Sequence, residues 1–344
     1  MYNYMFTTKY YTDLIVNDRT NKKLCIPNMT INQGQITVFD DITCNKLFSS
    51  IQTKLKNDHS ITMSLDEIKN LLKKCDENAF DIYKGPNIYD PFTALIRHFH
   101  LDVKEAIFYK YCKNANWLLD VGSGKLTDAQ YWDKVGVKHV IGIEPSTESI
   151  KMGYERLKKF RNKTDINVIN GVGNVDWTTD KKYEQVLAHT YDIVTFQFTL
   201  HYMMYEIEIV MKNILRVTRK GTKVIITCMD GKLIHDELHK NGKIEVRNNQ
   251  EPIFAIFPQY DHMETDIPKK SDILVYFKGT YGVVNGSVEP LVDTERLIRF
   301  FDNNGFKLLE IKKFLDYNSK NKQKMNDTQK QVSYYYTSLI FERV

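Results

Sequence analysis

The feature that most constrains the fold of this chain is the alternation of short apolar segments with longer amphipathic ones after residue 116. The apolar segments have the length of buried strands, and helices fit between them, notably at residues 146–160 and 203–217. Such an alternation builds a parallel sheet that is covered by helices on both faces. We therefore predict an α/β, Rossmann-like fold, with strands at residues 117–121, 138–143, 166–170, 192–196 and 223–228.

Segments on either side of this alternation extend the predicted fold. Residues 91–112 carry an apolar stripe at helical spacing, which predicts a helix before the first strand. The polar stretch at residues 318–330 is expected to form a loop. Further elements are expected after residue 244, namely strands at 273–277 and 331–341 and a helix at 294–301.

The first ninety residues lack this alternation and are expected to form an accessory extension. Residues 24–42 show no helical period and indicate short strands. A helix is expected from Ser64, because Ser64 and the acidic residue at the third position after it match a capping box. The sequence therefore predicts an extension at residues 1–90 and a catalytic domain at residues 91–344.

Composition limits the class of protein. Hydrophobic residues make up 42% of the chain without a run long enough to cross a membrane, so we expect a soluble protein without a membrane partner. The amino terminus lacks the pattern of a secretory signal, which favours a reducing compartment. The formal net charge of +5 permits a polyanionic partner without requiring one. Five cysteines without a Cys-x-x-Cys pair argue against a disulfide framework and a structural zinc site, and we predict no metal.

A glycine turn follows the first predicted strand and marks a ligand site. Gly122, Ser123 and Gly124 lie where a doubly wound sheet binds its ligand, beyond the carboxyl end of a strand. Thr127 replaces the third glycine of a dinucleotide fingerprint. Glu144 ends the second strand, where a carboxylate can accept hydrogen bonds from both ribose hydroxyls, although such a residue is often only a helix cap. Together these residues predict a ligand that contains adenosine.

The segment from residue 191 to 202 leads from the fourth predicted strand into a helix and carries Gln197, Phe198, His201 and Tyr202. With the glycine turn and the strand that follows, it resembles the guanine-N7 methyltransferase domain of mRNA capping enzymes, in particular those of poxviruses and other large cytoplasmic DNA viruses. The resemblance covers roughly residues 92–344. It implies a class I S-adenosylmethionine-dependent methyltransferase fold, S-adenosylmethionine as cofactor and the capped 5′ end of RNA as substrate.

The resemblance also implies roles for individual residues. Gln197 corresponds to a cofactor contact, and His201 and Tyr202 correspond to guanine contacts. Lys104 matches a lysine that the family has in the helix before the first strand. Asp128 matches an aspartate after the glycine turn. Lys104 and Asp128 are therefore expected on the cofactor side.

Two residues late in the chain complete the implied guanine site. Glu289 matches the acidic residue of a Val-x-Glu-x-Leu-Val segment in the family, and Tyr336 matches a tyrosine shortly before the final Phe-Glu-Arg. The neighbours Tyr334 and Tyr335 offer alternative registers for the tyrosine. A carboxylate can accept hydrogen bonds from guanine N1 and the exocyclic amine, and aromatic faces suit the cationic methylated base.

The sequence departs from the family pattern at the glycine turn and in the preceding helix. Leu126 and Thr127 stand where cellular relatives have two glycines, and His100 and Leu101 stand where they have two asparagines. These differences affect the shape of the turn and some cofactor contacts. On the adenine side, Val172 takes the place of an acidic residue.

Asn174 or Asp176 could substitute for that acidic residue, and Asn174 is the one that we assign to the cofactor. Asp120 ends the first strand, where it could receive the amino group of the methionine portion. Lys125 could steady the turn, meet the cofactor carboxylate, face the cap phosphates or be solvated. Lys151 and Arg156 belong to a basic stretch that either contacts the phosphates or forms a solvated helix face.

The chemistry that this resemblance implies needs little from the protein beyond orientation. Guanine N7 carries an in-plane lone pair at neutral pH, so its methylation requires no general base. We therefore predict no acid–base catalytic residue. The enzyme's task is to align N7, the methyl carbon and the sulfur.

Other functions remain open at the level of sequence. A small-molecule methyltransferase could use the same cofactor fold, and a non-catalytic RNA-binding or stimulatory subunit could retain it. The resemblance further implies partner domains with triphosphatase and guanylyltransferase activity in a longer, multifunctional capping enzyme. It implies the host cytoplasm as location, and also the virion.

Overall fold

The computed structural model describes residues 29–32, 35–38, 90–159, 163–278 and 287–344. The chain divides into two compact units, one made of residues 1–90 and 276–287 and the other of residues 91–275 and 288–344. In the first unit, β1 (Met29–Asn32) pairs antiparallel with β2 (Gln35–Val38), and these are short strands of the kind expected at residues 24–42. The helix expected from Ser64 lies outside the described residues.

A seven-stranded sheet forms the centre of the second unit, with the order β12-β13-β7-β6-β3-β4-β5. The five strands from β7 to β5 are mutually parallel, whereas β13 is antiparallel to β7 and β12 is antiparallel to β13. In chain order the parallel strands run third, second, first, fourth, fifth, as in doubly wound sheets. Their bounds are β3 (Trp117–Val121), β4 (His139–Glu144), β5 (Asp165–Asn170), β6 (Tyr191–Gln197), β7 (Thr218–Met229), β12 (Phe306–Lys313) and β13 (Tyr336–Arg343).

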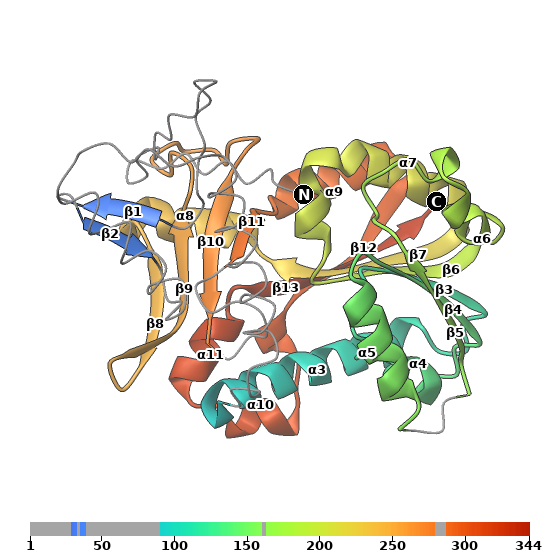
Figure 1. Ribbon diagram of the computed structural model, residues 1–344, viewed down its shortest axis with the longest axis horizontal. Helices are drawn as coiled ribbons and strands as arrows, with labels where there is room; N and C mark the ends of the chain where they lie inside the picture. Colours follow the sequence, from blue (N-terminus) through green and yellow to red (C-terminus); the bar gives the residue numbers. More distant parts are fainter. Residues whose placement is uncertain (1–28, 33–34, 39–89, 160–162, 279–286) are drawn as a thin grey trace, which may run out of the picture. The chain divides into compact units, whose positions relative to one another are not determined.

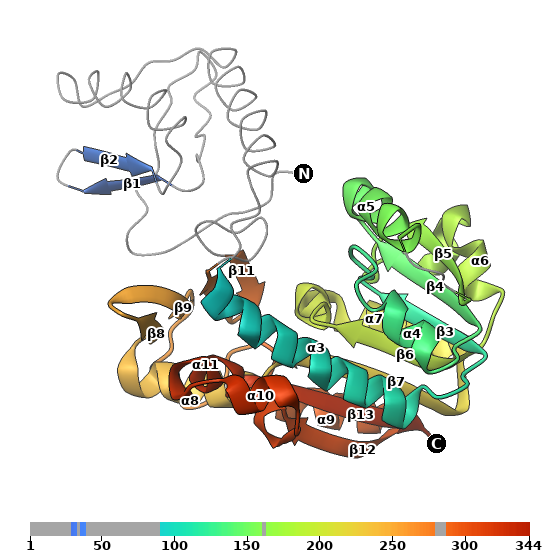
Figure 2. The same ribbon diagram turned by 90° about the horizontal axis from the view of Figure 1, so that it is seen from below.

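Helices cover both faces of this sheet, which confirms the predicted α/β fold. In Figures 1 and 2, α7 (Ile207–Val217) and α9 (Thr294–Asn303) lie on one face, and α3 (Pro91–Tyr111) and α4 (Ala129–Lys134) lie on the other. The helix α5 (Thr147–Leu157) packs against β4 and β5, and the short α6 (Glu184–Leu187) packs against α7. Buried apolar side chains from the strands form the core between these layers, among them Leu119, Ile141, Val194, Phe196 and Ile226.

Side-chain caps fix where several helices begin. Ser146 Oγ accepts a hydrogen bond from Ser149 N–H at 3.1 Å and starts α5. Asp230 caps α8 (Gly231–Asn241), and Asp293 caps α9 through Arg296 N–H. Each such cap contributes about 1 kcal/mol. The caps set the point at which the chain leaves the carboxyl end of a strand.

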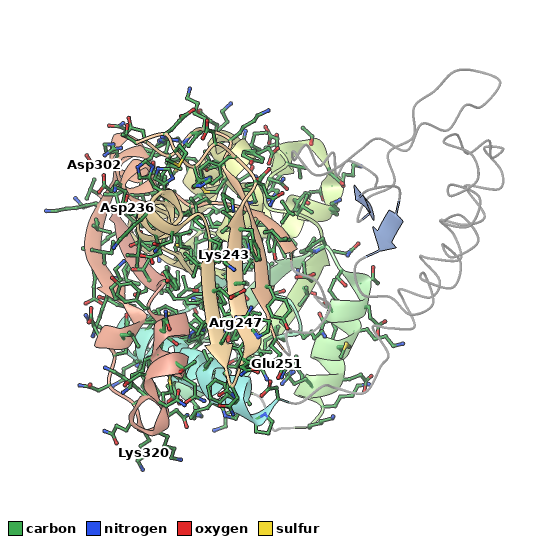
Figure 3. All side chains as sticks on the ribbon, turned by 90° about the vertical axis from the view of Figure 1, so that its left-hand side faces the viewer. Asp236, Lys243, Arg247, Glu251, Asp302 and Lys320 are labelled. Carbon is green, nitrogen blue, oxygen red and sulfur yellow. The ribbon has the colours of Figure 1, made fainter. Side chains whose placement is uncertain are left out.

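A second sheet of four strands has the order β11-β10-β9-β8, with bounds β11 (Ser287–Pro290), β10 (Asp272–Phe277), β9 (Glu251–Pro258) and β8 (Ile244–Asn248). The edge strand β8 buries Ile244 and Val246 and exposes Arg247, in alternation. Figure 3 shows Lys243, Arg247 and Glu251 along the β8–β9 hairpin. Charged side chains at an edge strand hinder pairing with another chain.

Two expectations from sequence are wrong near the carboxyl end. Residues 318–330 are not a loop but contain α10 (Lys320–Lys324) and the start of α11 (Asp327–Ser333). Asn326 and Gln329 form a reciprocal capping box, and Gln329 Nε2 also donates to the Phe92 carbonyl at 2.7 Å. Because α11 continues to Ser333, the last strand begins at Tyr336 and not near residue 331.

The helix expected at residues 203–217 also begins later. A 3-10 helix, η3 (Leu200–Glu206), precedes α7 and occupies its expected first turn. Among the described helices, none has the length and apolarity needed to cross a bilayer. Cys112 and Cys228 are buried free thiols, and the other three cysteines lie outside the described residues.

Candidate functional site

The glycine turn after β3 is held by backbone hydrogen bonds to β4. Gly122 N–H donates to the Ile143 carbonyl at 2.7 Å, and Gly124 N–H donates to Glu144 Oε2 at 2.9 Å. Gly122 has φ +84°, and a Cβ atom there would lie 2.4 Å from Thr199 Cγ2. Only glycine fits at this position, because a side chain would be strained and would collide with the segment after β6.

Glu144 fulfils the structural role that the sequence left open and keeps capacity for a ligand. Its Oε1 accepts a hydrogen bond from Ser146 N–H at 2.9 Å, while Oε2 accepts from Gly124 N–H. Each carboxylate oxygen has two lone pairs, so two acceptor positions remain for hydroxyl groups. The carboxylate is buried at the carboxyl end of β4, as the ribose assignment requires.

Leu126 explains how the turn forms without the glycines found in cellular relatives. It adopts φ +52°, a left-handed conformation that usually favours glycine. Its side chain is fully buried against Gly153 of α5, where a Cβ atom would lie 2.9 Å from Leu126 Cγ. Apolar burial of this side chain offsets the backbone strain of the turn.

A buried charge cluster lies at the end of β3. Lys104 Nζ of α3 forms an ion pair with Asp128 Oδ1 at 2.5 Å, and Thr195 Oγ1 donates to Asp120 Oδ1 at 2.5 Å. Burial raises the pKa of Asp120 to about 7, with a further increase from Asp128 and opposing effects of Thr195 and Lys104. The cluster of Asp120, Asp128 and Glu144 has one buried amine against three carboxyl groups, so it suits a ligand that brings an ammonium group.

Three buried polar atoms near these elements have no hydrogen-bond partner: Ser123 Oγ, Gln197 Nε2 and His201 Nε2. Within the described residues, Trp132 Nε1 is the other buried side-chain atom without one. Buried polar groups are normally hydrogen-bonded, and an unsatisfied group indicates a missing ligand or water. Gln197 is fixed by its other end, since Thr227 Oγ1 donates to Gln197 Oε1 at 3.0 Å. The residues present therefore fit S-adenosylmethionine.

The segment after β6 brings His201 and Tyr202 to Glu289. Phe198 turns the chain with φ +58°, and the 3-10 helix η3 follows. His201 Nε2 lies 3.4 Å from Glu289 Oε2, without the geometry of a hydrogen bond, and Tyr202 Oη donates to Glu289 Oε1 at 3.4 Å. Burial lowers the pKa of His201, an effect that Glu289 opposes. Tyr202 is 55% exposed, so its ring is accessible.

Tyr336, at the start of β13, belongs to the same side of the site. Burial raises its pKa, and Glu289 raises it further, which indicates that the phenol and this carboxylate are near each other. Its ring centroid lies 5.8 Å from that of Phe198, edge to face. Of the alternative registers, Tyr335 stacks on Phe254 of the second sheet, and Tyr334 is half exposed. Of the three tyrosines, Tyr336 is the one whose ring packs against Phe198 and whose pKa the charge of Glu289 raises.

His100 packs with Tyr336 and Phe198 on this side of the site. The sequence had marked it only as a departure from the family pattern. Its ring centroid lies 4.6 Å from that of Tyr336 and 6.0 Å from that of Phe198, and its Nε2 is 3.0 Å from Ser333 Oγ. Burial, with a smaller effect of Lys104, lowers the pKa of His100 to about 3. The imidazole is therefore neutral and packs as an aromatic ring.

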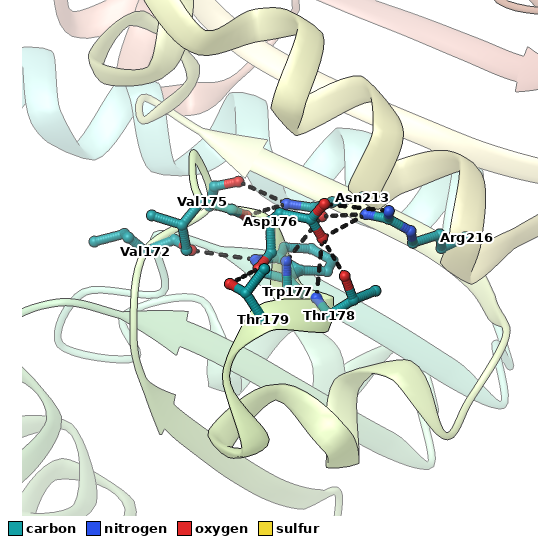
Figure 4. Close-up of polar contacts among 9 residues, drawn as sticks. Val172, Val175, Asp176, Trp177, Thr178, Thr179, Asn213 and Arg216 are labelled. Atoms are coloured by element: carbon teal, nitrogen blue, oxygen red, sulfur yellow. Dashed lines mark hydrogen bonds and ion pairs between the residues drawn. The ribbon is translucent and has the colours of Figure 1, made fainter.

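The loop after β5 carries both candidates for the adenine side, and Figure 4 shows the contacts of one of them, Asp176. Asp176 Oδ1 accepts a hydrogen bond from Thr178 N–H at 3.0 Å and forms an ion pair with Arg216 Nη1 at 2.8 Å. Asp176 is therefore engaged in the protein. Asn174 Nδ2 instead donates to Glu206 Oε2 at 3.1 Å, across to η3. Val172, at the position of the family's acid, is apolar.

The three residues predicted to contact the phosphates are Lys125, Lys151 and Arg156, and the first and last of them are in contact. Arg156 Nε donates to the Lys125 carbonyl at 3.1 Å, so these two residues are neighbours. Burial, followed by Arg156, lowers the pKa of Lys125, and Glu148 raises it. Lys151 lies exposed on α5. The structure thus brings together Lys125 and Arg156.

Sequence reasoning missed several residues that shape the site. Thr195 holds Asp120, and Thr199 Oγ1 donates to the Val121 carbonyl at 2.7 Å while its methyl group covers Gly122. Glu206 holds Asn174. Only their position in the motif at residues 191–202 could have indicated that Thr195 and Thr199 contribute to the site. No local pattern connects Glu206 with a loop about thirty residues earlier in the chain. In the described residues, no group of three His, Cys, Asp or Glu side chains could hold a metal ion.

Curated relatives of the chain are capping proteins. It is 25% identical over 272 residues to the mRNA-capping enzyme of African swine fever virus (isolate Pig/Kenya/KEN-50/1950), an alignment that covers 69% of this chain and 30% of that enzyme. It is 28% identical over 160 residues to the mRNA cap guanine-N(7) methyltransferase of Saccharomyces cerevisiae, covering 43% of this chain and 35% of that protein. The chain thus spans about a third of the length of these relatives.

Among solved structures, the CcbJ methyltransferase from Streptomyces caelestis aligns with the chain with a TM-score of 0.46 and 15% identity, covering 71% of this chain and 90% of that one. The family model of the mRNA (guanine-N(7))-methyltransferase domain matches residues 92–335. This match covers most of the chain and confirms the resemblance inferred from the motifs. The chain belongs to the mRNA (guanine-N(7))-methyltransferase domain family.

Proposed function

We propose that this chain transfers the methyl group of S-adenosylmethionine to N7 of the guanine in an RNA 5′ cap. The observation that carries the proposal is the convergence of His201, Tyr202 and Glu289 at the end of β6, next to Gln197 and the buried charge cluster. One edge of the sheet thereby offers a place for a cationic cofactor beside a place for a purine. The cofactor supplies an electrophilic methyl group on its sulfonium.

On the cofactor side, different side chains bind different parts of S-adenosylmethionine. Asp120, in the cluster with Lys104 and Asp128, receives the ammonium group, because the cluster has an excess of carboxyl groups. Glu144 accepts hydrogen bonds from the ribose hydroxyls. Ser123, Gln197 and the glycine turn provide polar contacts along the methionine portion.

On the guanine side, Glu289 selects the base. Its carboxylate accepts hydrogen bonds from N1–H and the exocyclic amine, which together identify guanine by its Watson–Crick edge. His201 is held neutral by burial and directs its Nε2 toward the same region. Tyr202 and Tyr336 provide aromatic faces for the base, whose charge becomes positive on methylation.

The protein's contribution to the reaction is orientation and exclusion of water. Guanine N7 has a free lone pair, so no side chain needs to remove a proton. Alignment of N7 with the methyl carbon and the sulfur lowers the barrier by about 7–11 kcal/mol in well-oriented systems. Lys125 and Arg156, with Lys151 of the same helix as Arg156 as a weaker contributor, attract the phosphates of the cap.

The direct test is transfer of a radiolabelled methyl group from S-adenosylmethionine to RNA with an unmethylated guanosine cap, followed by identification of the methylated atom. We expect 7-methylguanosine in the cap. Methylation of small amines or acids instead of capped RNA would establish a small-molecule methyltransferase. Binding of the cofactor without any transfer would establish a non-catalytic subunit.

We further propose that the chain works with triphosphatase and guanylyltransferase activities, since its African swine fever virus relative is named as an mRNA-capping enzyme and is more than three times as long as the aligned part. Capping of viral RNA would take place in the host cytoplasm and in the virion. Fractionation of infected cells, with an antibody against this chain, tests that location.

A further inference from the structure

The loop that follows β5 borders the place where the cofactor's base must lie. Gly171 N–H donates to the Glu144 carbonyl at 3.1 Å, so the loop starts beside the ribose carboxylate. At Gly173 a Cβ atom would lie 2.6 Å from Val121 Cγ1 and 2.5 Å from Met203 Sδ. The loop therefore returns from the sheet edge to β3 and η3. A base attached to a ribose at Glu144 has this loop as its neighbour.

Most polar groups of the loop are engaged in holding its shape (Figure 4). Asn213 Nδ2 donates to the carbonyls of Gly173, at 3.2 Å, and Val175, at 2.6 Å. Trp177 Nε1 donates to the Val172 carbonyl at 3.2 Å. Asp176 is occupied by Thr178 and Arg216, as described above. These hydrogen bonds hold the loop in its shape.

Asn174 is held at one end of its amide, and among the described residues no hydrogen bond reaches the other end. Its Nδ2 donates to Glu206 Oε2 at 3.1 Å. A carboxylate has no proton to donate, so it can face only the amino end of an asparagine side chain. The carbonyl oxygen Oδ1 is therefore turned away from Glu206. In the part of the chain that the structure describes, Oδ1 accepts no hydrogen bond.

Glu206 lies at the junction between η3 and α7. It is the N-cap residue of α7, yet its carboxylate accepts no hydrogen bond from the first turn. The side chain instead reaches the loop after β5, and the backbone around it belongs to η3, which also carries Met203 against Gly173. Contacts to η3 thus fix both the backbone and the amide of this part of the loop.

We propose that Asn174 Oδ1 accepts a hydrogen bond from the exocyclic amine of the cofactor's adenine, and that Glu206 is a positioning residue that holds the amide in this accepting orientation. The inference rests on the proposed use of S-adenosylmethionine. It assigns the recognition of the base to an amide and its carboxylate partner. Hypoxanthine carries a carbonyl oxygen in place of the amine, so it would face Oδ1 with a second acceptor.

The test compares the binding of S-adenosylhomocysteine and S-inosylhomocysteine by calorimetry. We expect the wild-type protein to prefer the adenine compound by about tenfold or more, since one compound gains a hydrogen bond and the other leaves an acceptor unpaired. Asn174→Ala removes this contact and should abolish that part of the preference. Glu206→Ala should reduce it about threefold or more, because the freed amide can turn its Nδ2 toward the hypoxanthine oxygen. In the double variant the preference should equal that of Asn174→Ala alone.

Glu208→Ala is the matched control, since Glu208 is an exposed carboxylate in the first turn of the same helix. It should leave the preference unchanged, and the unfolding temperature of each variant verifies its fold. An equal loss of affinity for both compounds in Glu206→Ala and Asn174→Ala would mean a purely structural role and would overturn the inference. A wild-type protein that binds neither compound overturns the proposed function as well. Selective binding without methylation of capped RNA overturns the proposed function alone.

Discussion

The centre of the cofactor half of the site comes from one short stretch of the chain, whereas the guanine half joins residues from three distant elements. Gly122, Glu144 and the turn between them belong to one strand–helix–strand unit. His201, Glu289 and Tyr336 come from η3, β11 and β13. The first half is shaped mainly by its backbone. The second half depends on how two late strands pack against η3.

This difference separates the consequences of substitution. A change in the cofactor half disturbs the turn or the buried charges, so it should alter ligand affinity and stability together. A change in the guanine half removes a side chain that does not hold the backbone of the cofactor site. It should therefore alter turnover of capped RNA while cofactor affinity stays the same. The following predictions test that separation, from the largest expected effect to the smallest.

Gly122→Ala should break the cofactor half most severely. The new Cβ atom would lie 2.4 Å from Thr199 Cγ2, and alanine disfavours the observed φ of +84°. We expect the affinity for S-adenosylhomocysteine to fall roughly 100-fold. Gly124→Ala is the control, because its Cβ would have no atom within 4 Å, and its effect should stay below about tenfold. Calorimetry of both variants measures the difference, and equal losses would refute the role of the collision.

Glu289→Gln should break only the guanine half. The amide replaces an acceptor with a donor that faces the donors of guanine, so kcat/KM for capped RNA should fall roughly 10- to 100-fold. The affinity for S-adenosylhomocysteine should not change. Glu251→Gln, at an exposed position on β9, serves as the control. Normal turnover by the Glu289 variant would remove this residue from the proposed site.

The pH dependence of cofactor binding should sharpen the role of Asp120. Its pKa is raised to about 7 by burial and Asp128, with a smaller increase from Glu144, and is opposed by Thr195 and Lys104. An ammonium ligand favours the ionised form, so the affinity for S-adenosylhomocysteine should rise with pH, by at most about tenfold per unit, and level off above pH 7.

The stability of the unliganded protein should change in the opposite direction. The folded state holds the Asp120 proton up to about pH 7, whereas the ordinary value for aspartate is 3.8. The free energy of unfolding should therefore decrease as pH rises from about 4 to about 7. Asp120→Asn should remove the contribution of this group to the pH dependence of both the cofactor affinity and the free energy of unfolding. A binding curve of Asp120→Asn with the wild-type pH slope would show that another group titrates.

Arg156→Ala should have the smallest effect. Arg156 is exposed and contacts the Lys125 carbonyl, so it acts on the phosphates through solvent-screened charge. We expect KM for capped RNA to rise about two- to fivefold, with a larger change at low salt. Lys158→Ala is the control, since Lys158 pairs with Glu155 on the same helix. Equal effects of the two variants would indicate a diffuse charge field and not a specific contact.

Sequence predicted the fold better than the details of the site. The strands and the glycine turn follow from local periodicity and from the limited choice of residues that tolerate a tight turn. The helices at residues 320–324 and 327–333 were missed, because they depend on caps and on a contact between Gln329 and Phe92. The pairing of Glu206 with Asn174 could not be predicted, because it depends on tertiary proximity and not on any local pattern.

The left-handed leucine in the turn links two positions of the chain that would otherwise vary independently. Leu126 fills the space that the absent side chain of Gly153 leaves on α5. An alanine at residue 153 is compatible only with a smaller residue at 126, and a glycine at 126 leaves a void unless residue 153 grows. In a set of homologous sequences we therefore expect the sizes of these two residues to covary inversely, a pattern that can be counted without any assay.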